Sequence, residues 1–419
     1  MSFSLLGLSP VLVRAAAELG FVTPTPIQAQ AIPAVLRGAD VQGCAQTGSG
    51  KTAAFALPIL QRLQAGPHQQ PRRTRALILV PTRELAAQVG EVMRRLAHAD
   101  SAAQPLKVAV VFGGVSINPQ MMQLRGGADV VVATPGRLLD LLQHNALRLS
   151  SVEMLVLDEA DRLLDLGFAE ELHRVLWLVP PQRQSLFFSA TFPPAVQELA
   201  SGLLRDPVRL DVPATAATEP AIAQRVIRID EKRRTELLRH LLTENHWERV
   251  LVFVATRYAA QHVAWKLHQS GIFASPFHGD MSQGARQQVL TEFKNGQWDV
   301  LVTTDLASRG IDIAQLAVVV NYDLPRSAVD YVHRIGRTGR AGASGLAVSF
   351  VTAASAAHFA LIEKRQHLSL PREQVPGFEP VESEVAAPAA GAAGTGGIKG
   401  KRPSKKDKLR AAAARTPKA

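Results

Sequence analysis

The chain has 419 residues, of which 47% are hydrophobic and 5% aromatic, and its formal net charge is +11. This length exceeds what one hydrophobic core usually supports, so we expect two domains with short extensions. The single cysteine, Cys44, excludes an internal disulfide or a cysteine-based zinc cluster. No stretch resembles a secretory leader or approaches the roughly 18 apolar residues of a membrane span, so we expect a cytoplasmic protein with no membrane partner.

Short β-branched runs alternate with longer stretches of helical periodicity, which is typical of parallel sheets with crossover helices. In the first half the candidate strands are Ala76–Val80, Val108–Phe112, Val130–Ala133, Met154–Leu157 and Ser185–Phe188. In the second half they are Val250–Ala255, Val300–Thr303, Ala317–Asn321 and Leu346–Val351. The pattern predicts an α/β fold with two parallel-sheet domains.

A glycine-rich loop follows the first apolar-to-loop transition and reads Ala45-Gln46-Thr47-Gly48-Ser49-Gly50-Lys51-Thr52. Such a loop aims backbone N–H groups at a phosphate, and the helix N-terminus behind it adds partial positive charge. Lys51 would reach the β- and γ-phosphates of a nucleotide. The strict pattern has glycine where this chain has Ala45, so a plain connector is the alternative interpretation.

Carboxylates follow the buried strand candidate 154–157 in the sequence Asp158-Glu159-Ala160-Asp161. An open α/β sheet binds its ligands at this end of its strands. Asp158 and the Thr52 hydroxyl would hold Mg²⁺, leaving Glu159 to orient or deprotonate a water. Solvated loop charges are the alternative, but the loop and the carboxylates together, in this order, predict a nucleoside triphosphatase.

The segment Asp211–Pro220 interrupts the strand and helix pattern, carries two prolines and reads as a flexible link. We therefore divide the chain into a first lobe (1–210), a linker (211–223), a second lobe (224–370) and a low-complexity tail (371–419). A cleft between two hinged lobes is expected.

Three arginines recur at a spacing of three in the second half, at Arg334, Arg337 and Arg340, with Gly336 and Gly339 between them. They would repel one another without an anion to share, and a γ-phosphate is a natural one for an arginine finger from a separate lobe. A solvated basic turn is the alternative.

The tail carries most of the net charge. From Lys399 onward nine Lys and Arg face a single Asp407, which is +8, while the rest of the chain is +3. A segment of Ala, Gly, Pro and Lys cannot bury enough apolar surface to fold, so we expect disorder after about residue 380. This basic end is either a solubilising terminus or an electrostatic tether for nucleic acid.

Taken together, these motifs resemble the full set of the DEAD-box RNA helicases. The matching stretches are Phe21–Gln28, Ala45–Thr52, Pro81–Ala86, Thr134–Arg137, Asp158–Asp161, Ser189–Thr191, Thr304–Asp312 and His333–Arg340. They cover residues 3 to about 350 in family order, and alanine at position 45 is usual in this family. The stretch Val111–Met122 further resembles the bacterial RhlE branch.

The resemblance implies two RecA-like lobes with ATP and Mg²⁺ between them. It places Phe3 on the adenine face and Gln28 on the adenine edge, and assigns nucleotide contacts to Gly310 and to Asp312, which would bond the ribose. Arg337 and Arg340 resemble the two fingers. Asp161, Ser189, Thr191 and His333 resemble the residues that couple ATP to lobe movement.

By the same resemblance, RNA contacts fall on Thr82, Arg83, Gly114, Thr134 and Arg137 in the first lobe and on Thr256, Gln283, Arg286 and Thr304 in the second. Hydroxyls, amides, glycines and arginines bind sugar and phosphate without reading bases, so RNA recognition independent of sequence is implied.

The sequence therefore predicts an ATP-dependent RNA helicase that unwinds duplexes locally or remodels RNA–protein complexes, in ribosome assembly or RNA turnover, with ribosomal precursors or the RNA-decay machinery as partners. Two alternatives stay open: an ATP-gated RNA clamp with little unwinding, and an ATPase that acts on DNA.

Overall fold

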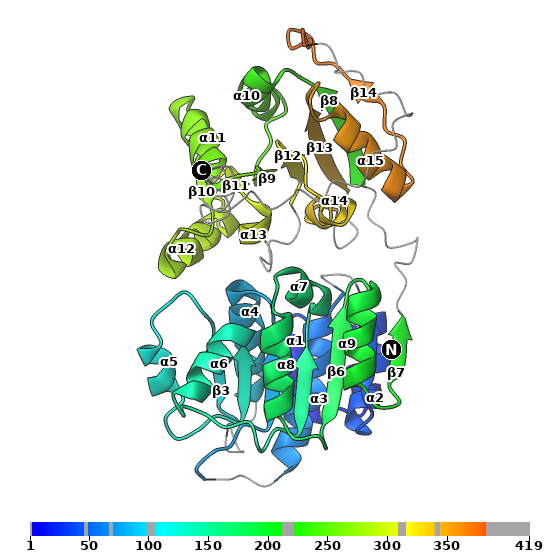
Figure 1. Ribbon diagram of the computed structural model, residues 1–419, viewed down its shortest axis with the longest axis vertical. Helices are drawn as coiled ribbons and strands as arrows, with labels where there is room; N and C mark the ends of the chain where they lie inside the picture. The colour runs from blue at the N-terminus through cyan, green and yellow to red at the C-terminus, as the bar shows by residue number, and fades with distance from the viewer. Residues whose placement is uncertain are drawn as a thin grey trace, which may run out of the picture.

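The structure is a computed structural model that describes residues 2–45, 49–66, 70–98, 105–211, 222–308, 316–339 and 344–382. Outside these ranges lie Gln46, Thr47, Gly48, Gly310, Asp312 and Arg340, together with the tail from residue 383 and the disorder and tether predictions made for it. The described chain forms two α/β lobes, each built on a seven-stranded sheet (Figure 1). The predicted fold class is confirmed.

The first lobe has the strand order β3-β4-β2-β5-β6-β1-β7, and all of its pairings are parallel. Its strands are β1 (Val41–Cys44), β2 (Ala76–Leu79), β3 (Val108–Val111), β4 (Val130–Ala133), β5 (Met154–Leu157), β6 (Gln184–Ser189) and β7 (Val208–Asp211). Its helices are η1 (Phe3–Leu6), α1 (Pro10–Glu18), α2 (Pro26–Leu36), α3 (Lys51–Ala65), α4 (Arg83–Ala97), α5 (Asn118–Gln123), α6 (Pro135–Gln143), α7 (Ala160–Asp165), α8 (Ala169–Leu178) and α9 (Pro194–Leu203).

Helices cover both faces of this sheet, because its strands are apolar on both sides. Ala76 and Ile78 of β2 join a core cluster with α2 and α3, whereas Leu77 and Leu79 join a second cluster with α6 and α8. Alternate residues of one strand thus feed two separate cores. Each fully buried aliphatic side chain contributes about 1.5–3 kcal/mol, which fixes the sheet and the loops at its edges.

The second lobe has the strand order β10-β11-β9-β12-β13-β8-β14, again parallel. Its strands are β8 (Ile222–Arg228), β9 (Val250–Phe253), β10 (Ala274–Phe277), β11 (Val300–Thr303), β12 (Val318–Asn321), β13 (Gly345–Val351) and β14 (Arg372–Glu373). Its helices are η2 (Glu231–Arg233), α10 (Arg234–Glu244), α11 (Arg257–Gln269), α12 (Gln283–Lys294), α13 (Asp305–Ser308), α14 (Ala328–Ile335) and α15 (Ala356–Gln366).

The two sheets repeat one topology. Counted from the first strand of each lobe, both run third, fourth, second, fifth, sixth, first, seventh. Loops that follow equivalent strands therefore occupy equivalent places in the two lobes. Thr82 after β2 and Thr256 after β9 illustrate this, because each caps the next helix by accepting a hydrogen bond from a backbone N–H three residues on.

The second lobe extends beyond the boundary at residue 371 that composition suggests. β14 pairs with β8, Val375 is buried, and the backbone N–H of Val381 donates to the Asp230 carboxylate at 3.0 Å. At the other end, β8 begins at Ile222, inside the stretch assigned to the linker. The averaged composition of a segment hides the few apolar residues, such as Val375, that fasten it to a core.

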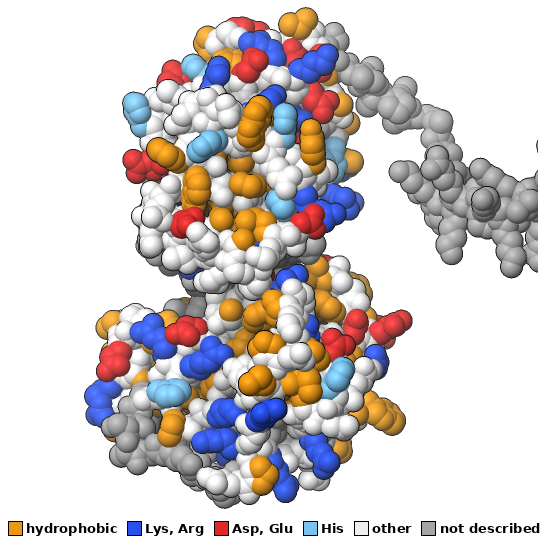
Figure 2. All heavy atoms as spheres, turned by 90° about the vertical axis from the view of Figure 1, so that its left-hand side faces the viewer, with side chains coloured by type: hydrophobic (Ala, Val, Ile, Leu, Met, Phe, Trp, Pro, Cys, Tyr) orange, Lys and Arg blue, Asp and Glu red, His pale blue; other side chains and the backbone are white. Residues whose placement is uncertain are grey.

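The lobes meet at a narrow waist (Figure 2). One buried ion pair joins them, between Arg286 Nη2 of α12 and Glu84 Oε1 of α4 at 2.6 Å. Figure 1 shows α7 of the first lobe and α13 and α14 of the second lobe at this junction. The loops after the strands of both lobes therefore reach the same region.

Candidate functional site

The phosphate loop is described from Ser49 onward. Gly50 has φ +92° and precedes α3, and a Cβ on it would lie 2.3 Å from Gln28 Nε2. Only glycine suits this position, since a side chain would be strained as well as obstructed. Lys51 opens α3, is buried, and donates from Nζ to the Ala45 carbonyl at 3.0 Å. This hydrogen bond joins the two ends of the phosphate loop. The N-terminus of α3, with the partly exposed Thr52, follows the loop directly.

Gln28 is committed to the protein backbone in this structure. Its Oε1 accepts from the Thr25 N–H at 2.9 Å and its Nε2 donates to the Gly50 carbonyl at 3.0 Å. The first bond completes a capping box for α2, and the second ties that helix to the phosphate loop. One amide hydrogen is left for another acceptor, so the adenine contact stays a prediction.

Phe3 lies in the apolar core of the first lobe and is 2% exposed. A stack on an adenine ring would require one face of this side chain to be uncovered. That role also stays a prediction.

The carboxylates at the end of β5 are buried together. Burial raises the pKa of the Asp158 carboxyl to about 6, with Lys51 acting in the opposite direction and Glu159 adding to the rise. Glu159 has φ +51°, a conformation that non-glycine residues adopt mainly where the surrounding structure enforces it. Its Oε2 is buried without a hydrogen bond among the described residues and lies 3.7 Å from Arg162 Nε.

These features fit a nucleotide with Mg²⁺. The Asp158 carboxyl is destabilised in its charged form by burial, and a divalent cation would relieve this. Within the described ranges no group of three or more His, Cys, Asp or Glu could hold a metal. If Mg²⁺ binds here, Asp158 and Thr52 would hold it, and phosphate and water oxygens would complete its shell, which is its usual mode with nucleotides.

Asp161, Ser189 and Thr191 form one hydrogen-bonded cluster. Asp161 Oδ2 accepts from the Thr191 N–H and Oγ1 at 3.0 and 2.8 Å, and the Asp161 N–H donates to Ser189 Oγ at 3.2 Å. The loop after β6 is thereby fixed to the loop after β5. The structure brings these three predicted residues together, and their coupling role is not tested by this arrangement alone.

His333 and Arg337 of the second lobe lie beside Arg162, which follows the acidic motif of the first lobe. His333, Arg334 and Arg337 line a cavity of about 10 Å³ together with Arg162 of the first lobe. Burial lowers the pKa of His333 to about 4, and Arg162 adds to this. His333 is thus neutral at pH 7, while Arg337 is 6% exposed.

Arg334 does not behave as the sequence pattern suggests. Its guanidinium makes a bidentate pair with the Asp305 carboxylate, at 2.5 and 2.8 Å, and also donates to the Asp323 carbonyl at 2.6 Å. The anion that this arginine shares is therefore a protein carboxylate rather than a phosphate. Spacing alone could not reveal a partner 29 residues away.

Five residues of the first lobe are predicted to bind RNA. Four of them contact one another directly or through a residue next in the chain. A Cβ on Gly114 would lie 2.4 Å from Arg83 Nη1, and the adjacent Gly113 N–H donates to Thr134 Oγ1 at 3.3 Å. Arg137 Nη2 donates to the Val115 carbonyl at 2.7 Å, while its Nε and Nη1 make no hydrogen bond within the described ranges. Thr82 caps the adjacent α4. A shared surface at the carboxyl ends of β2, β3 and β4 results.

The predicted contacts of the second lobe are less uniform. Thr256 is exposed and Thr304 is nearly buried, and Gln283 holds a buried Oε1 without a hydrogen-bond partner in the described chain. Arg286 is 4% exposed, pairs with Glu84, and lies over the Phe277 ring at 4.6 Å. Its charge is thus already compensated here.

Sequence reasoning gave no separate role to Glu84, Arg162 or Asp305. Glu84 bridges the lobes, Arg162 lies between Glu159 and His333, and Asp305 holds Arg334. All three lie inside or directly after stretches that carry the family resemblance, which is the signal that could have drawn attention to them. Their partners come from distant parts of the chain.

Comparison with known proteins agrees with this geometry. The family model "DEAD/DEAH box helicase" matches residues 25–199, and the "Helicase conserved C-terminal domain" matches residues 233–342. The chain is 41% identical to the ATP-dependent RNA helicase DeaD of Mycobacterium tuberculosis, over 92% of this chain and 67% of that protein. It is 40% identical to the DEAD-box ATP-dependent RNA helicase CshA of Streptococcus pneumoniae, over 92% of this chain and 71% of that one.

Among solved structures, S. cerevisiae Dbp5 bound to RNA and ADP BeF3 is 32% identical, with a TM-score of 0.78 over 89% of this chain and 95% of Dbp5. A Dbp5 variant bound to Nup159, a Gle1 variant, IP6 and ADP is 30% identical, with a TM-score of 0.60 over 90% of this chain and 96% of that one. The matched domains, the relatives and the paired lobes lead to one conclusion: this chain belongs to the DEAD-box family of ATP-dependent RNA helicases.

Proposed function

We propose that the chain hydrolyses ATP at the junction of its lobes while RNA lies across both, and that this cycle separates short RNA duplexes or remodels RNA–protein complexes. The observation that carries the proposal is the small cavity in which Arg162 of α7 meets His333 and Arg337, beside the buried Glu159. Groups from both lobes are needed to complete this site.

Each residue has a definite task in this proposal. Lys51 and the backbone N–H groups at the start of α3 hold the phosphates, and Thr52 and Asp158 hold Mg²⁺, which neutralises phosphate charge when bound. Glu159 orients a water and accepts its proton. Arg337, with Arg340, stabilises charge that develops on the phosphoryl group, as arginine fingers do.

The placement of the lobes supports an RNA-bound arrangement. Two Dbp5 structures cover nearly the same share of this chain, yet the one bound to RNA and ADP BeF3 has the higher TM-score, 0.78 against 0.60. We attribute the difference between the scores to the relative placement of the lobes. The Glu84–Arg286 pair would hold that placement.

Local unwinding agrees with the energetics. Stacking contributes about 1.4 kcal/mol per base-pair step, measured for DNA, so opening a few pairs is within reach of one ATP-driven closure. Predicted contacts on both lobes favour sugar and phosphate, so the substrate is RNA without a sequence preference.

The test compares ATP hydrolysis and strand release on one duplex sequence made as RNA and as DNA. RNA alone should stimulate hydrolysis, and ATP should release the strand of a short RNA duplex. Stimulation without strand release favours the ATP-gated clamp, and equal stimulation by DNA favours the DNA-dependent ATPase, since only RNA presents the 2′-hydroxyl.

The finer assignments of branch, substrate and compartment also belong to this proposal. The Val111–Met122 stretch supports an RhlE-like branch, and cytoplasmic ribosome assembly or RNA turnover is the setting that this branch suggests. No helix of the described chain has the length and apolar character to cross a bilayer. Crosslinking in cells, followed by identification of the bound RNAs, tests the setting: ribosomal precursors or decay intermediates are expected, and their absence contradicts it.

A further inference from the structure

A large pocket lies away from the junction, on the first lobe. It has a volume of about 870 Å³ and is formed by the loops that lead into β2, β4 and β5, together with α5 and the end of α6. Because the sheet is parallel, these loops lie at its amino-terminal edge, opposite the nucleotide and the predicted RNA contacts. The residues assigned to nucleotide binding are absent from its lining.

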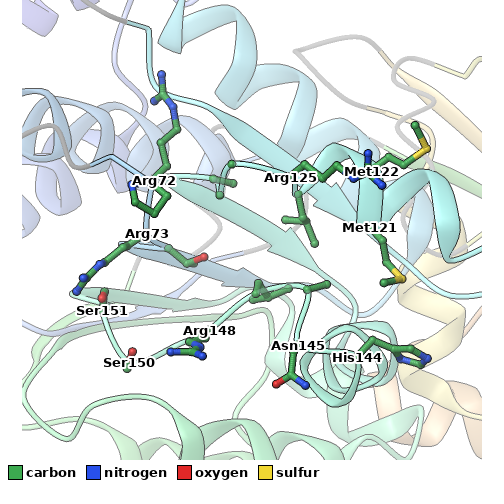
Figure 3. A pocket seen from close by; sticks show the side chains of 18 of the residues that line it. Arg72, Arg73, Met121, Met122, Arg125, His144, Asn145, Arg148, Ser150 and Ser151 are labelled. Atoms are coloured by element: carbon green, nitrogen blue, oxygen red, sulfur yellow. The ribbon is translucent and has the colours of Figure 1, made fainter.

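The pocket is strongly basic. Arg72, Arg73, Arg125 and Arg148 line it, and none of its 19 lining residues is Asp or Glu. Figure 3 shows the four arginine side chains coming from three separate loops around the opening. In the space-filling view, Lys and Arg side chains also gather on the lower part of the first lobe (Figure 2).

Three of these charges are uncompensated. Arg72 pairs with Asp129, which does not line the pocket. Arg73, Arg125 and Arg148 are exposed and make no salt bridge with any described carboxylate. Cations brought together in this way repel one another unless an anion joins them, and planar guanidinium groups match the oxygens of a phosphate.

The remaining lining suits a sugar–phosphate chain. Ser150 and Ser151 bring hydroxyls, Asn145 an amide and His144 an imidazole, while Met121 and Met122 give apolar contact. Hydroxyl, amide and arginine groups are those that bind nucleic-acid backbones. A mononucleotide would leave much of a pocket of this size empty.

The position of the pocket favours RNA over a free polyphosphate. α6 carries Thr134 and Arg137 at its start, and its C-terminal cap is His144 at the pocket. Nine helical residues span about 14 Å, so the pocket lies roughly that far from the predicted RNA contacts. α5 also connects the two places, because it begins at Asn118, four residues after Gly114, and supplies Met121 and Met122.

From this arrangement we infer that the arginine pocket is a second RNA site, which binds phosphates of a strand that extends past the junction along α5 and α6. The inference rests on the proposed function, since it takes RNA as the substrate. RNA that reaches the pocket would be held on the first lobe at any stage of the ATP cycle, because the described part of the second lobe contributes no lining residue.

The test uses the full chain and two matched double variants. R125Q/R148Q removes two pocket charges, and R95Q/R174Q removes two exposed arginines of the same lobe, from α4 and α8, that do not line the pocket. Binding is measured with a single-stranded RNA of about six nucleotides and with the same RNA extended to about 16, a range that single-strand binding sites span.

On the long RNA, R125Q/R148Q should bind about tenfold more weakly at low salt than R95Q/R174Q. The steepness of its log–log salt dependence should fall by about 1.4, since each phosphate contact on a single strand contributes about 0.7. On the short RNA the two variants should bind alike. Equal binding of the long RNA overturns the inference, as does equal loss on both lengths.

Two further measurements separate the alternatives. If R125Q/R148Q loses binding of poly-glutamate or of inorganic polyphosphate while its RNA binding matches the control, the pocket serves an acidic protein or a free polyphosphate, and the RNA site is refuted. ATPase stimulation by the short RNA reports the proposed function separately. If the unsubstituted chain shows none, the proposed function fails whatever the pocket binds.

Discussion

Glu159 combines an enforced backbone conformation with a buried carboxylate, one oxygen of which finds no hydrogen-bond partner among the residues that the structure describes. Glu159→Gln should keep the size of the side chain and leave ATP binding nearly intact. RNA-stimulated turnover should fall about 10²–10⁴-fold, which is the usual contribution of a general base. Turnover within twofold of the parent chain would remove Glu159 from the chemistry.

Gly50 is the second residue whose identity the geometry dictates. In Gly50→Ala the new Cβ would meet Gln28 Nε2 at 2.3 Å in a left-handed backbone, so the loop must shift and ATP affinity should fall at least tenfold. Gly202→Ala is the control, because this glycine lies in α9 with open space around it and should stabilise the lobe by roughly 0.5–1 kcal/mol. Nucleotide titration and thermal unfolding measure both. An unchanged affinity in Gly50→Ala would contradict the loop geometry.

His333 makes closure of the lobes sensitive to pH. Burial, together with Arg162 and Arg337, lowers its pKa from 6.5 to about 4 against the opposing effect of Asp161 and Asp330, so the closed arrangement binds fewer protons than the open one. Closure should therefore be fully available above about pH 7, weaken as pH falls through 6.5, and carry the whole penalty below about 4. Near pH 5.5 the closed fraction should drop by up to roughly tenfold.

Energy transfer between dyes on the two lobes, recorded from pH 7.5 to 5.5, measures this effect. His333→Gln carries no titrating group at this position and should flatten the pH response while closing normally at pH 7. A pH response of equal size in His333→Gln would assign the effect to other groups, such as Asp158.

At the scale of elements, the sequence predicts the buried strands well. β4, β5 and β11 have the expected bounds, because four consecutive β-branched or aliphatic residues bounded by turn residues allow little else. β1, β7 and β10 are absent from the candidate strands, and so are β14 and β8. The residues of β14 and β8, Arg372-Glu373 and Ile222–Arg228, are mixed in polarity, and only pairing with a neighbour across the sheet makes them strands.

In the site, too, local motifs could be predicted from the sequence, whereas pairings set by tertiary structure could not. The phosphate loop and the acidic motif could be located from local sequence because each is a short contiguous motif at a strand end, whereas the link of Asp161 to Ser189 and Thr191 came from the family resemblance. The carboxylate partners of Arg286 and Arg334 could not be predicted. Glu84 and Asp305 reach these arginines only through the tertiary structure. The phosphate predicted for Arg334 was wrong for that reason.

At the scale of the whole molecule, the Glu84–Arg286 pair is a buried ion pair that joins the two lobes. Both side chains are nearly buried, so removing one leaves the other as an uncompensated buried charge. Glu84→Gln and Arg286→Gln should each open the lobes and raise the RNA concentration needed for half-maximal ATPase. The double variant should lose less than the sum of the two single losses. Interlobe energy transfer checks closure, and additive losses would contradict direct pairing.

Because one strand order occurs twice, every loop in this protein has a counterpart that was free to change independently. The threonine cap after the second strand is present in both halves, at Thr82 and Thr256. The loop after the first strand has diverged: it is rich in glycine before α3, but reads Asp230-Glu231-Lys232-Arg233 after β8. The two lobes thus share the threonine cap at a predicted RNA contact, whereas the glycine-rich loop after the first strand occurs in the first lobe alone, so the nucleotide phosphates are expected to bind there.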